Sequence, residues 1–141
     1  MNSFRHRKRN AKSLVAALVL RSGAANFQYA LFLSDAVSRY GGEEFLVVLP
    51  GCDVKSGCDR AEHIRHSLAL SPVITGDAAI PLTLSMGAAS SAEWPALNAE
   101  DLIRKADEAL YRAKAEGRNR VIVSRPAGFE LVRPVGQLTI V

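Results

Sequence analysis

The sequence has few of the features of a disulfide-bonded or zinc-stabilised protein. Its only cysteines are Cys52 and Cys58, and their spacing differs from the gap of about two to four residues found in zinc knuckles. We therefore expect both thiols to be reduced and structural. A metal site that adds His63 and His66 stays open, although histidines three residues apart suit a metal poorly.

The sequence also has no long hydrophobic run. Leu14 to Leu20 is an apolar run that ends at Arg21. Because a transmembrane helix needs roughly 20 apolar residues, we predict no stable membrane span. Basic residues before the run and small residues after it imitate a secretion signal. We interpret the run instead as a short helix or as the remnant of a disrupted upstream segment.

Aspartate is absent from Met1 to Ser34. Much of the formal net charge of +4 sits in the block from Arg5 to Arg9, so the overall pI overstates how basic the folded part is. A block of like charge is usually a solvated, mobile end. Nucleic acid is therefore not a predicted partner, and contact of this tail with phosphate or with a membrane surface is the alternative.

The composition fits one ordinary globular domain. With 141 residues, 48% of them hydrophobic and 23% charged, the chain can bury a core. Residues 36–40 and 43–49 read as the two strands of a hairpin, with Gly41 and Gly42 at its tip. The second strand is nearly all apolar, which is typical of a strand covered on both faces.

Two helices and two further strands are expected after the hairpin. An apolar stripe predicts a helix from Val54 to Leu68, with Glu62 among the polar residues off the stripe. Residues 82–88 and 120–123 read as strands, and the helix between them begins at the N-cap Asn98 and stops at Gly117. Its apolar face consists of Leu102, Ile103, Ala106, Ala109, Leu110 and Ala113. This order predicts an α/β fold with one mixed sheet and packed helices.

The hairpin tip carries the first candidate chemistry. Adjacent glycines permit positive φ values and let a ligand approach the backbone closely. Glu43 and Glu44 follow, and they point to opposite faces because side chains alternate across a strand. One of them would serve metal binding or catalysis and the other a separate contact. An ordinary acidic hairpin is the alternative.

A polar ribbon on the second helix is the other candidate. Asp107, Tyr111, Lys114 and Arg118 recur three or four residues apart beside the apolar face. A Lys and an Arg one turn apart can hold a triphosphate, the Arg through its planar fork and the Lys as a point charge. Taken singly, each can also be a complement of the helix dipole.

Three blocks of sequence connect these candidates to one family. They are SRYGGEEF at 38–45, LSMG at 84–87 and ADEALYRAKAEGRNR at 106–120. Together, over residues 35–123, they resemble the GGDEF domain of bacterial diguanylate cyclases in its GGEEF form. The resemblance implies a sheet like that of nucleotide cyclases and polymerase palms, in a cytoplasmic enzyme of bacterial signalling. Such a domain condenses two GTP molecules into cyclic di-GMP with Mg²⁺ or Mn²⁺, and it acts as a homodimer.

The resemblance also implies roles for individual residues. Glu43 matches the catalytic acid that binds the metal. Gly41, Gly42 and Glu44 match positions that lie against the substrate. Lys114 and Arg118 match the family's phosphate contacts.

The N-terminal third departs from the family pattern. The family's first strand and helices supply an aspartate for the metal and polar residues that read guanine, and residues 1–34 offer no match for them. We therefore expect the first strand-helix unit to be missing. The predicted division is an atypical basic and apolar segment at 1–34, a partial GGDEF domain at 35–123 and a tail at 124–141.

The site at which the family binds its own product is also altered. Asp35 is a remnant of that site, but Phe32 stands where many members carry arginine, and His63 replaces another basic residue. We expect a diguanylate cyclase-type domain that is truncated and has weak or no activity alone. The alternative is a degenerate module that acts in GTP binding or dimerisation without catalysis.

Overall fold

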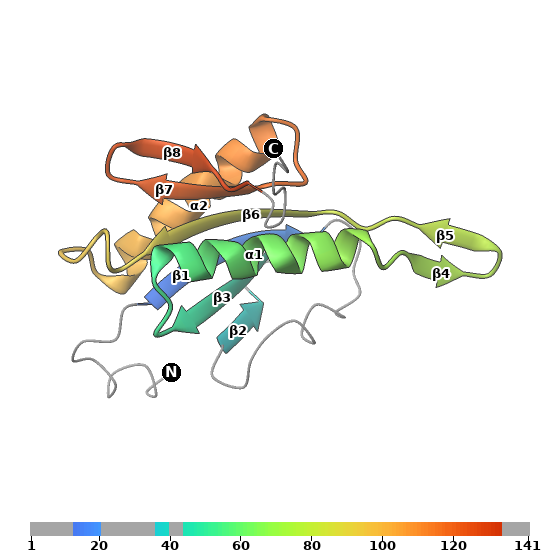
Figure 1. The fold of residues 1–141 in the computed structure, drawn as a ribbon, viewed down its shortest axis with the longest axis horizontal. Coiled ribbons are helices and arrows are strands. Elements are labelled where there is room, and N and C mark those ends of the chain that lie inside the picture. Colours follow the sequence, from blue (N-terminus) through green and yellow to red (C-terminus); the bar gives the residue numbers. More distant parts are fainter. Residues whose placement is uncertain (1–12, 21–35, 40–43, 134–141) are drawn as a thin grey trace, which may run out of the picture.

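The computed structural model describes residues 13–20, 36–39 and 44–133. Within these ranges the elements follow the chain in the order shown in Figure 1. The strands are β1 (Ser13–Leu20), β2 (Ala36–Arg39), β3 (Glu44–Pro50), β4 (Val73–Thr75), β5 (Ala78–Ile80), β6 (Leu84–Ser90), β7 (Val121–Arg125) and β8 (Gly128–Leu131). The helices are α1 (Val54–Ala69) and α2 (Ala99–Ala115).

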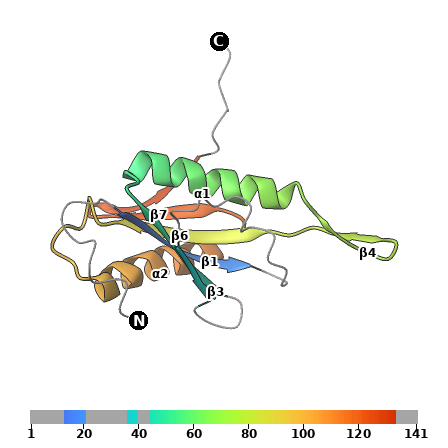
Figure 2. The same ribbon diagram turned by 90° about the horizontal axis from the view of Figure 1, so that it is seen from below.

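One mixed sheet forms the centre of the molecule. Its strand order is β2-β3-β1-β6-β7-β8, with β6 and β7 parallel and the other neighbours antiparallel. The helices α1 and α2 cover opposite faces of this sheet (Figure 2). The predicted α/β class with a mixed sheet and packed helices is therefore confirmed.

The N-terminal apolar run corrects the sequence analysis. Ser13–Leu20 is a strand and not a short helix, and it pairs with β3 on one side and β6 on the other. A first strand thus lies at the centre of the sheet, so the expectation that this strand is missing was wrong. The helix of this unit, which was also expected to be missing, would fall in residues 21–35, and these lie outside the described residues.

The predicted hairpin strands are confirmed. β2 and β3 are antiparallel, with Arg39 opposite Phe45. Val47 and Leu49 pack into the core on the α1 side, whereas Leu46 packs against the cluster on the α2 side. β3 is therefore covered on both faces, as its apolar sequence indicates. The predicted tip, Gly41 and Gly42, lies outside the described residues.

Helix α1 confirms most of its predicted stripe. Asp53 caps its N-terminus by accepting a hydrogen bond from the Ser56 amide at 2.7 Å. Cys58, Ile64 and Leu68 are buried against the sheet together with Ala61. Glu62 is an exception: it was expected among the polar residues off the stripe, but it is buried, with only 3% of its surface exposed.

Helix α2 packs more closely on the sheet than α1 does. Asn98 accepts a hydrogen bond from the Asp101 amide, so the predicted N-cap is confirmed. The predicted face is buried at Leu102, Ala106, Ala109, Leu110 and Ala113, with Ile103 partly buried. Gly87 on β6 faces the backbone of α2, where a side chain would meet Ala106 O and Leu110 N at 2.1 Å. A residue without Cβ therefore sets the distance between β6 and α2.

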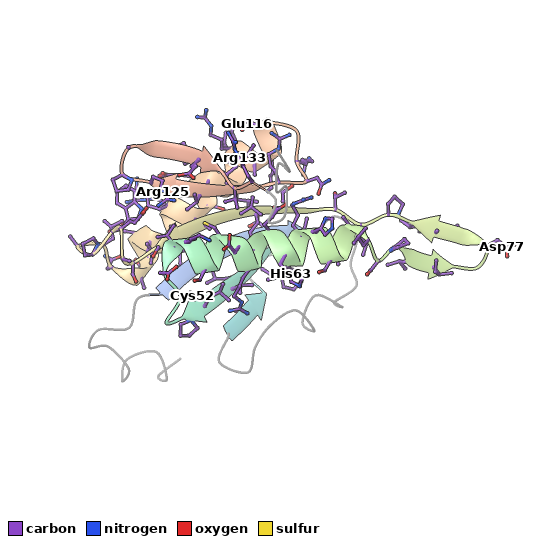
Figure 3. All side chains as sticks on the ribbon, viewed as in Figure 1. Cys52, His63, Asp77, Glu116, Arg125 and Arg133 are labelled. Carbon is purple, nitrogen blue, oxygen red and sulfur yellow. The ribbon has the colours of Figure 1, made fainter. Side chains whose placement is uncertain are left out.

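Besides β1, a hairpin and an edge strand were not predicted. The strands β4 and β5 form a hairpin that begins directly after Pro72. Gly76 lies at its tip in the left-handed region (φ 59). This hairpin extends away from the body of the molecule, with Asp77 at its end (Figures 1 and 3). The C-terminal segment, which the sequence left open, adds β8 to the edge of the sheet beside β7.

Candidate functional site

The site residues predicted from the sequence divide into two groups. Gly41, Gly42, Glu43 and Asp35 lie outside the described residues, so their roles stay predictions. Glu44 is the first residue of β3, Lys114 lies in the last turn of α2, and Arg118 follows that helix. These three can be placed.

Glu44 and Lys114 meet although 70 positions separate them in the sequence. The Lys114 Nζ donates a hydrogen bond to Glu44 Oε1 at 3.3 Å. The Lys114 side chain is 29% exposed and the Glu44 side chain 38% exposed. Water therefore partly screens the pair, which contributes about 1 kcal/mol or less to stability. Its interest is geometric, because it shows that the start of the second hairpin strand lies beside the C-terminal part of α2.

Arg118 belongs to an unusual helix end. The Gly117 amide donates to Lys114 O at 3.4 Å and the Arg118 amide to Ala113 O at 2.9 Å, which is the Schellman pattern. Gly117, Arg118 and Asn119 have φ values of 121, 64 and 46 degrees. The Arg118 side chain is exposed, and among the described residues it has no hydrogen bond or ion pair.

The other two members of the polar ribbon are exposed on α2. Tyr111 is 76% exposed, and Asp107 lies in the wall of a pocket of about 230 Å³. The pocket lies between the start of β3 and the first half of α2. Its lining residues are Glu44, Phe45, Leu46, Glu100, Ile103, Arg104 and Asp107.

Sequence reasoning did not include Glu100 and Arg104 in this site. Glu100 lies in the first turn of α2, where an acidic side chain complements the helix dipole. Yet Glu100, Arg104 and Asp107 recur at spacings of four and three residues, the same interval that identified the ribbon. That spacing could have extended the ribbon toward the N-terminus of α2.

The described residues form no metal-binding group, and the predicted ligand, Glu43, lies outside them. No three acidic, histidine or cysteine side chains in the described part of the chain lie together as a metal-binding group. Glu44 already accepts a hydrogen bond from Lys114, and the β1 residue opposite Glu44 is Val19. Residues 1–34 contain neither aspartate nor glutamate. The Cys/His metal site has no support among the described residues either. Cys58 is buried, whereas His63 is exposed on α1 (Figure 3).

A family model for "Diguanylate cyclase, GGDEF domain" matches residues 3–120. The chain therefore belongs to the GGDEF diguanylate cyclase family, whose members generally use divalent metal ions. The match begins within residues 1–34. The division of the chain into an atypical segment at 1–34, a partial GGDEF domain and a tail stays a prediction.

Two bacterial proteins illustrate the relationship. The chain is 37% identical over 92 residues to diguanylate cyclase A of Treponema denticola, which covers 65% of this chain and 24% of that protein. It is 37% identical over 109 residues to the response regulator PleD of Caulobacter vibrioides, covering 74% and 23% respectively. The chain thus spans about a quarter of the length of these relatives.

Solved structures confirm the fold. The GGDEF domain of DgcB from Caulobacter crescentus, in complex with c-di-GMP, superposes with a TM-score of 0.69 at 21% identity, covering 81% of this chain and 78% of that one. The active GGEEF domain of a diguanylate cyclase from Vibrio cholerae gives a TM-score of 0.65 at 25% identity, covering 81% and 83%. Within the described ranges, neither helix has the length and apolar character needed to cross a membrane.

Proposed function

We propose that this chain is a diguanylate cyclase-type domain that binds GTP beside β3 and the C-terminal end of α2. In this proposal it condenses two GTP molecules into cyclic di-GMP only weakly, or not at all, when it acts alone. The contact between Glu44 and Lys114 is the observation that carries the proposal, because it joins the GGEEF strand to the predicted phosphate-binding residues.

Lys114 and Arg118 supply the charge for the triphosphate. Lys114 presents an ammonium group at the edge of the sheet, and Arg118 presents an exposed guanidinium about one turn farther along. A guanidinium can donate two parallel hydrogen bonds to a phosphate, whereas an ammonium acts as a point charge. The pair can therefore orient a triphosphate and offset part of its negative charge. On this basis the ligand is a nucleoside triphosphate, and family membership makes GTP the expected one.

Weak activity follows from the shortage of carboxylates. Metal-assisted displacement on a phosphate needs ligands that fix the ion against both reacting groups. Glu43 is the predicted ligand, and the segment before Asp35 supplies no second acid. Catalysis would also require a second GTP-bearing domain, so a homodimer in the cytoplasm, where GTP is available, is part of the proposal.

A degenerate module is the second candidate. It would bind GTP or dimerise without chemistry. The observation that favours it is the same absence of acidic residues from 1–34. The two candidates agree on GTP binding and differ on turnover, so one set of purified variants tests both.

The experiment measures GTP affinity and product formation in the purified chain. Lys114→Ala and Arg118→Ala should each weaken GTP binding about tenfold to a hundredfold, since a hydrogen bond to a charged group is worth about 1.5–3 kcal/mol. Arg112→Ala is the matched control, because Arg112 lies on the same helix but pairs with Glu116 and lies over the Phe129 ring. Equal losses in all three variants would indicate nonspecific charge attraction and would contradict the proposal.

Turnover separates the enzyme from the binding module. Wild-type chain is incubated with GTP and magnesium, and the nucleotides are separated by chromatography. We expect little or no cyclic di-GMP. Production at roughly one turnover per second or faster, lost in Glu43→Ala, would show that the chain has metal ligands beyond those predicted.

A further inference from the structure

A buried ion pair on α1 reaches the loop that carries Arg118. Glu62 is 3% exposed and accepts two hydrogen bonds from Arg65, from Nε at 2.9 Å and from Nη2 at 2.5 Å. The third donor of the fork, Arg65 Nη1, lies 2.8 Å from Asn119 Oδ1. The chain Glu62, Arg65 and Asn119 therefore connects α1 with the segment that follows α2.

Asn119 is also held from its backbone side. Its amide donates to Ser85 Oγ at 3.1 Å, and Ser85 is 4% exposed on β6. The neighbouring Arg118 carbonyl accepts a hydrogen bond from Arg120 Nε at 3.0 Å. Both sides of the Arg118 to Asn119 peptide are thus held, the amide by Ser85 of β6 and the carbonyl by Arg120 of the same loop.

The backbone that these contacts hold is strained. Non-glycine residues with positive φ cost on the order of 1–3 kcal/mol each, and they persist only where the surroundings enforce them. Arg118 and Asn119 are two such residues in succession, after Gly117. The Schellman motif needs one left-handed residue, which Gly117 provides. Termination of α2 therefore does not explain the conformations of Arg118 and Asn119.

The ion pair is built to present a fixed donor. The Arg65 side chain is 13% exposed and that of Glu62 is 4% exposed. The hydrogen bond to Glu62 raises the pKa of Arg65 in spite of its burial, so the guanidinium stays charged. With Nε and Nη2 committed to Glu62, the plane of the fork is fixed and Nη1 can point in only one direction. Asn119 Oδ1 occupies that direction.

From these contacts we infer that Glu62, Arg65 and Asn119 are positioning residues for Arg118. They hold the loop in the left-handed conformation that aims the Arg118 guanidinium at the triphosphate. The inference rests on the proposed function, in which Arg118 binds phosphate. It adds that the binding strength of Arg118 depends on residues of α1 that never touch the nucleotide.

Substitutions at Asn119 test this without disturbing the buried pair. Asn119→Asp keeps an acceptor for Arg65 and tolerates the left-handed region. Asn119→Gly relieves the backbone strain but removes the acceptor. Asn119→Ala removes the acceptor and keeps the strain. If the loop is merely structural, Asn119→Gly should change only the stability and leave ligand affinity unchanged. A positioning role requires that the affinity fall as well.

The measurement is the affinity of the full chain for GTP and for inorganic tripolyphosphate, with thermal unfolding recorded for every variant. We expect Asn119→Gly and Asn119→Ala to weaken both ligands about tenfold, and Asn119→Asp to remain within about twofold of wild type. In an Arg118→Ala background, Asn119→Gly should have no further effect, because its influence acts through Arg118.

The outcomes separate this inference from the function on which it rests. If wild-type chain binds neither GTP nor tripolyphosphate, the proposed function fails and the inference fails with it. If wild type binds, but Asn119→Gly has no effect or adds fully to Arg118→Ala, only the positioning role is overturned. Arg65→Lys provides a second route, since a lysine keeps the charge beside Glu62 but lacks the fork. It should weaken binding to the same degree as Asn119→Gly.

Discussion

The close approach of β6 and α2 makes Gly87→Ala the sharpest test of the fold. A Cβ at this position would lie 2.1 Å from both Ala106 O and Leu110 N, and 2.7 Å from Leu110 Cα, whereas ordinary contacts begin at 3.4 Å. The helix would have to move by more than an ångström. Because all three obstacles are backbone atoms, no side-chain rotation relieves the clash.

The expected cost can be worked out from these contacts. Overpacking costs about 1–3 kcal/mol and occasionally more, and a backbone clash belongs at the upper end. Replacing glycine within a strand returns about 0.5–1 kcal/mol of backbone entropy. The net loss is about 2–3 kcal/mol out of the roughly 5–15 kcal/mol of a typical domain. Gly87→Ala should therefore still fold, but its melting temperature should lie about 10 °C below that of wild type.

Calorimetry measures this shift, and GTP binding measures its effect on the site. A displaced α2 carries Lys114 away from Glu44, so the affinity for GTP should fall as well. Gly76→Ala is the control, because nothing lies within 4 Å of its Cβ position. Its positive φ costs about 1 kcal/mol at the tip of a remote hairpin, so stability falls slightly and GTP affinity stays unchanged. A melting temperature for Gly87→Ala within about 2 °C of wild type would refute the reasoning.

Three further predictions concern the core and the product site. Glu62→Gln leaves the Arg65 guanidinium largely buried without its counter-charge, so urea unfolding should show a loss of about 3 kcal/mol, and a loss below about 1 kcal/mol would contradict a buried pair. Burial raises the pKa of the Cys58 thiol from 9.0 to about 11. The protonated thiol therefore contributes its full stability below pH 9, and this contribution is lost as the pH rises toward 11. The urea midpoint should fall between pH 9 and 11 more steeply for wild type than for Cys58→Ala. Phe32 cannot supply the guanidinium fork that a guanine and its phosphate need, so calorimetry should detect no tight binding of cyclic di-GMP, and submicromolar binding abolished by Asp35→Ala would contradict this.

The sequence by itself determined the elements whose signals are local. Asn98 and Gly117 marked the two ends of α2, and the apolar stripe between them identified its buried face. Alternating turn and apolar signals identified β2 and β3. These signals are reliable because capping and periodicity depend on residues a few positions apart. The three blocks of sequence at 38–45, 84–87 and 106–120 were together sufficient to identify the family.

Tertiary structure decided the features that depend on distant partners. The run from Leu14 to Leu20 is short and wholly apolar, so its periodicity cannot separate strand from helix. It is a strand because β3 and β6 leave a place between them whose backbone groups must be paired.

The same reason applies to the charged residues. Glu62 looked like a surface residue on a helical wheel, but Arg65 satisfies its carboxylate and allows its burial. Lys114 and Glu44 meet only because α2 packs on the face of the sheet to which Glu44 and Leu46 of β3 point. Arg118 has its left-handed conformation in a loop whose next residue, Asn119, is held by Arg65 and Ser85. A local pattern cannot encode these contacts, because each depends on which elements the folded chain brings together.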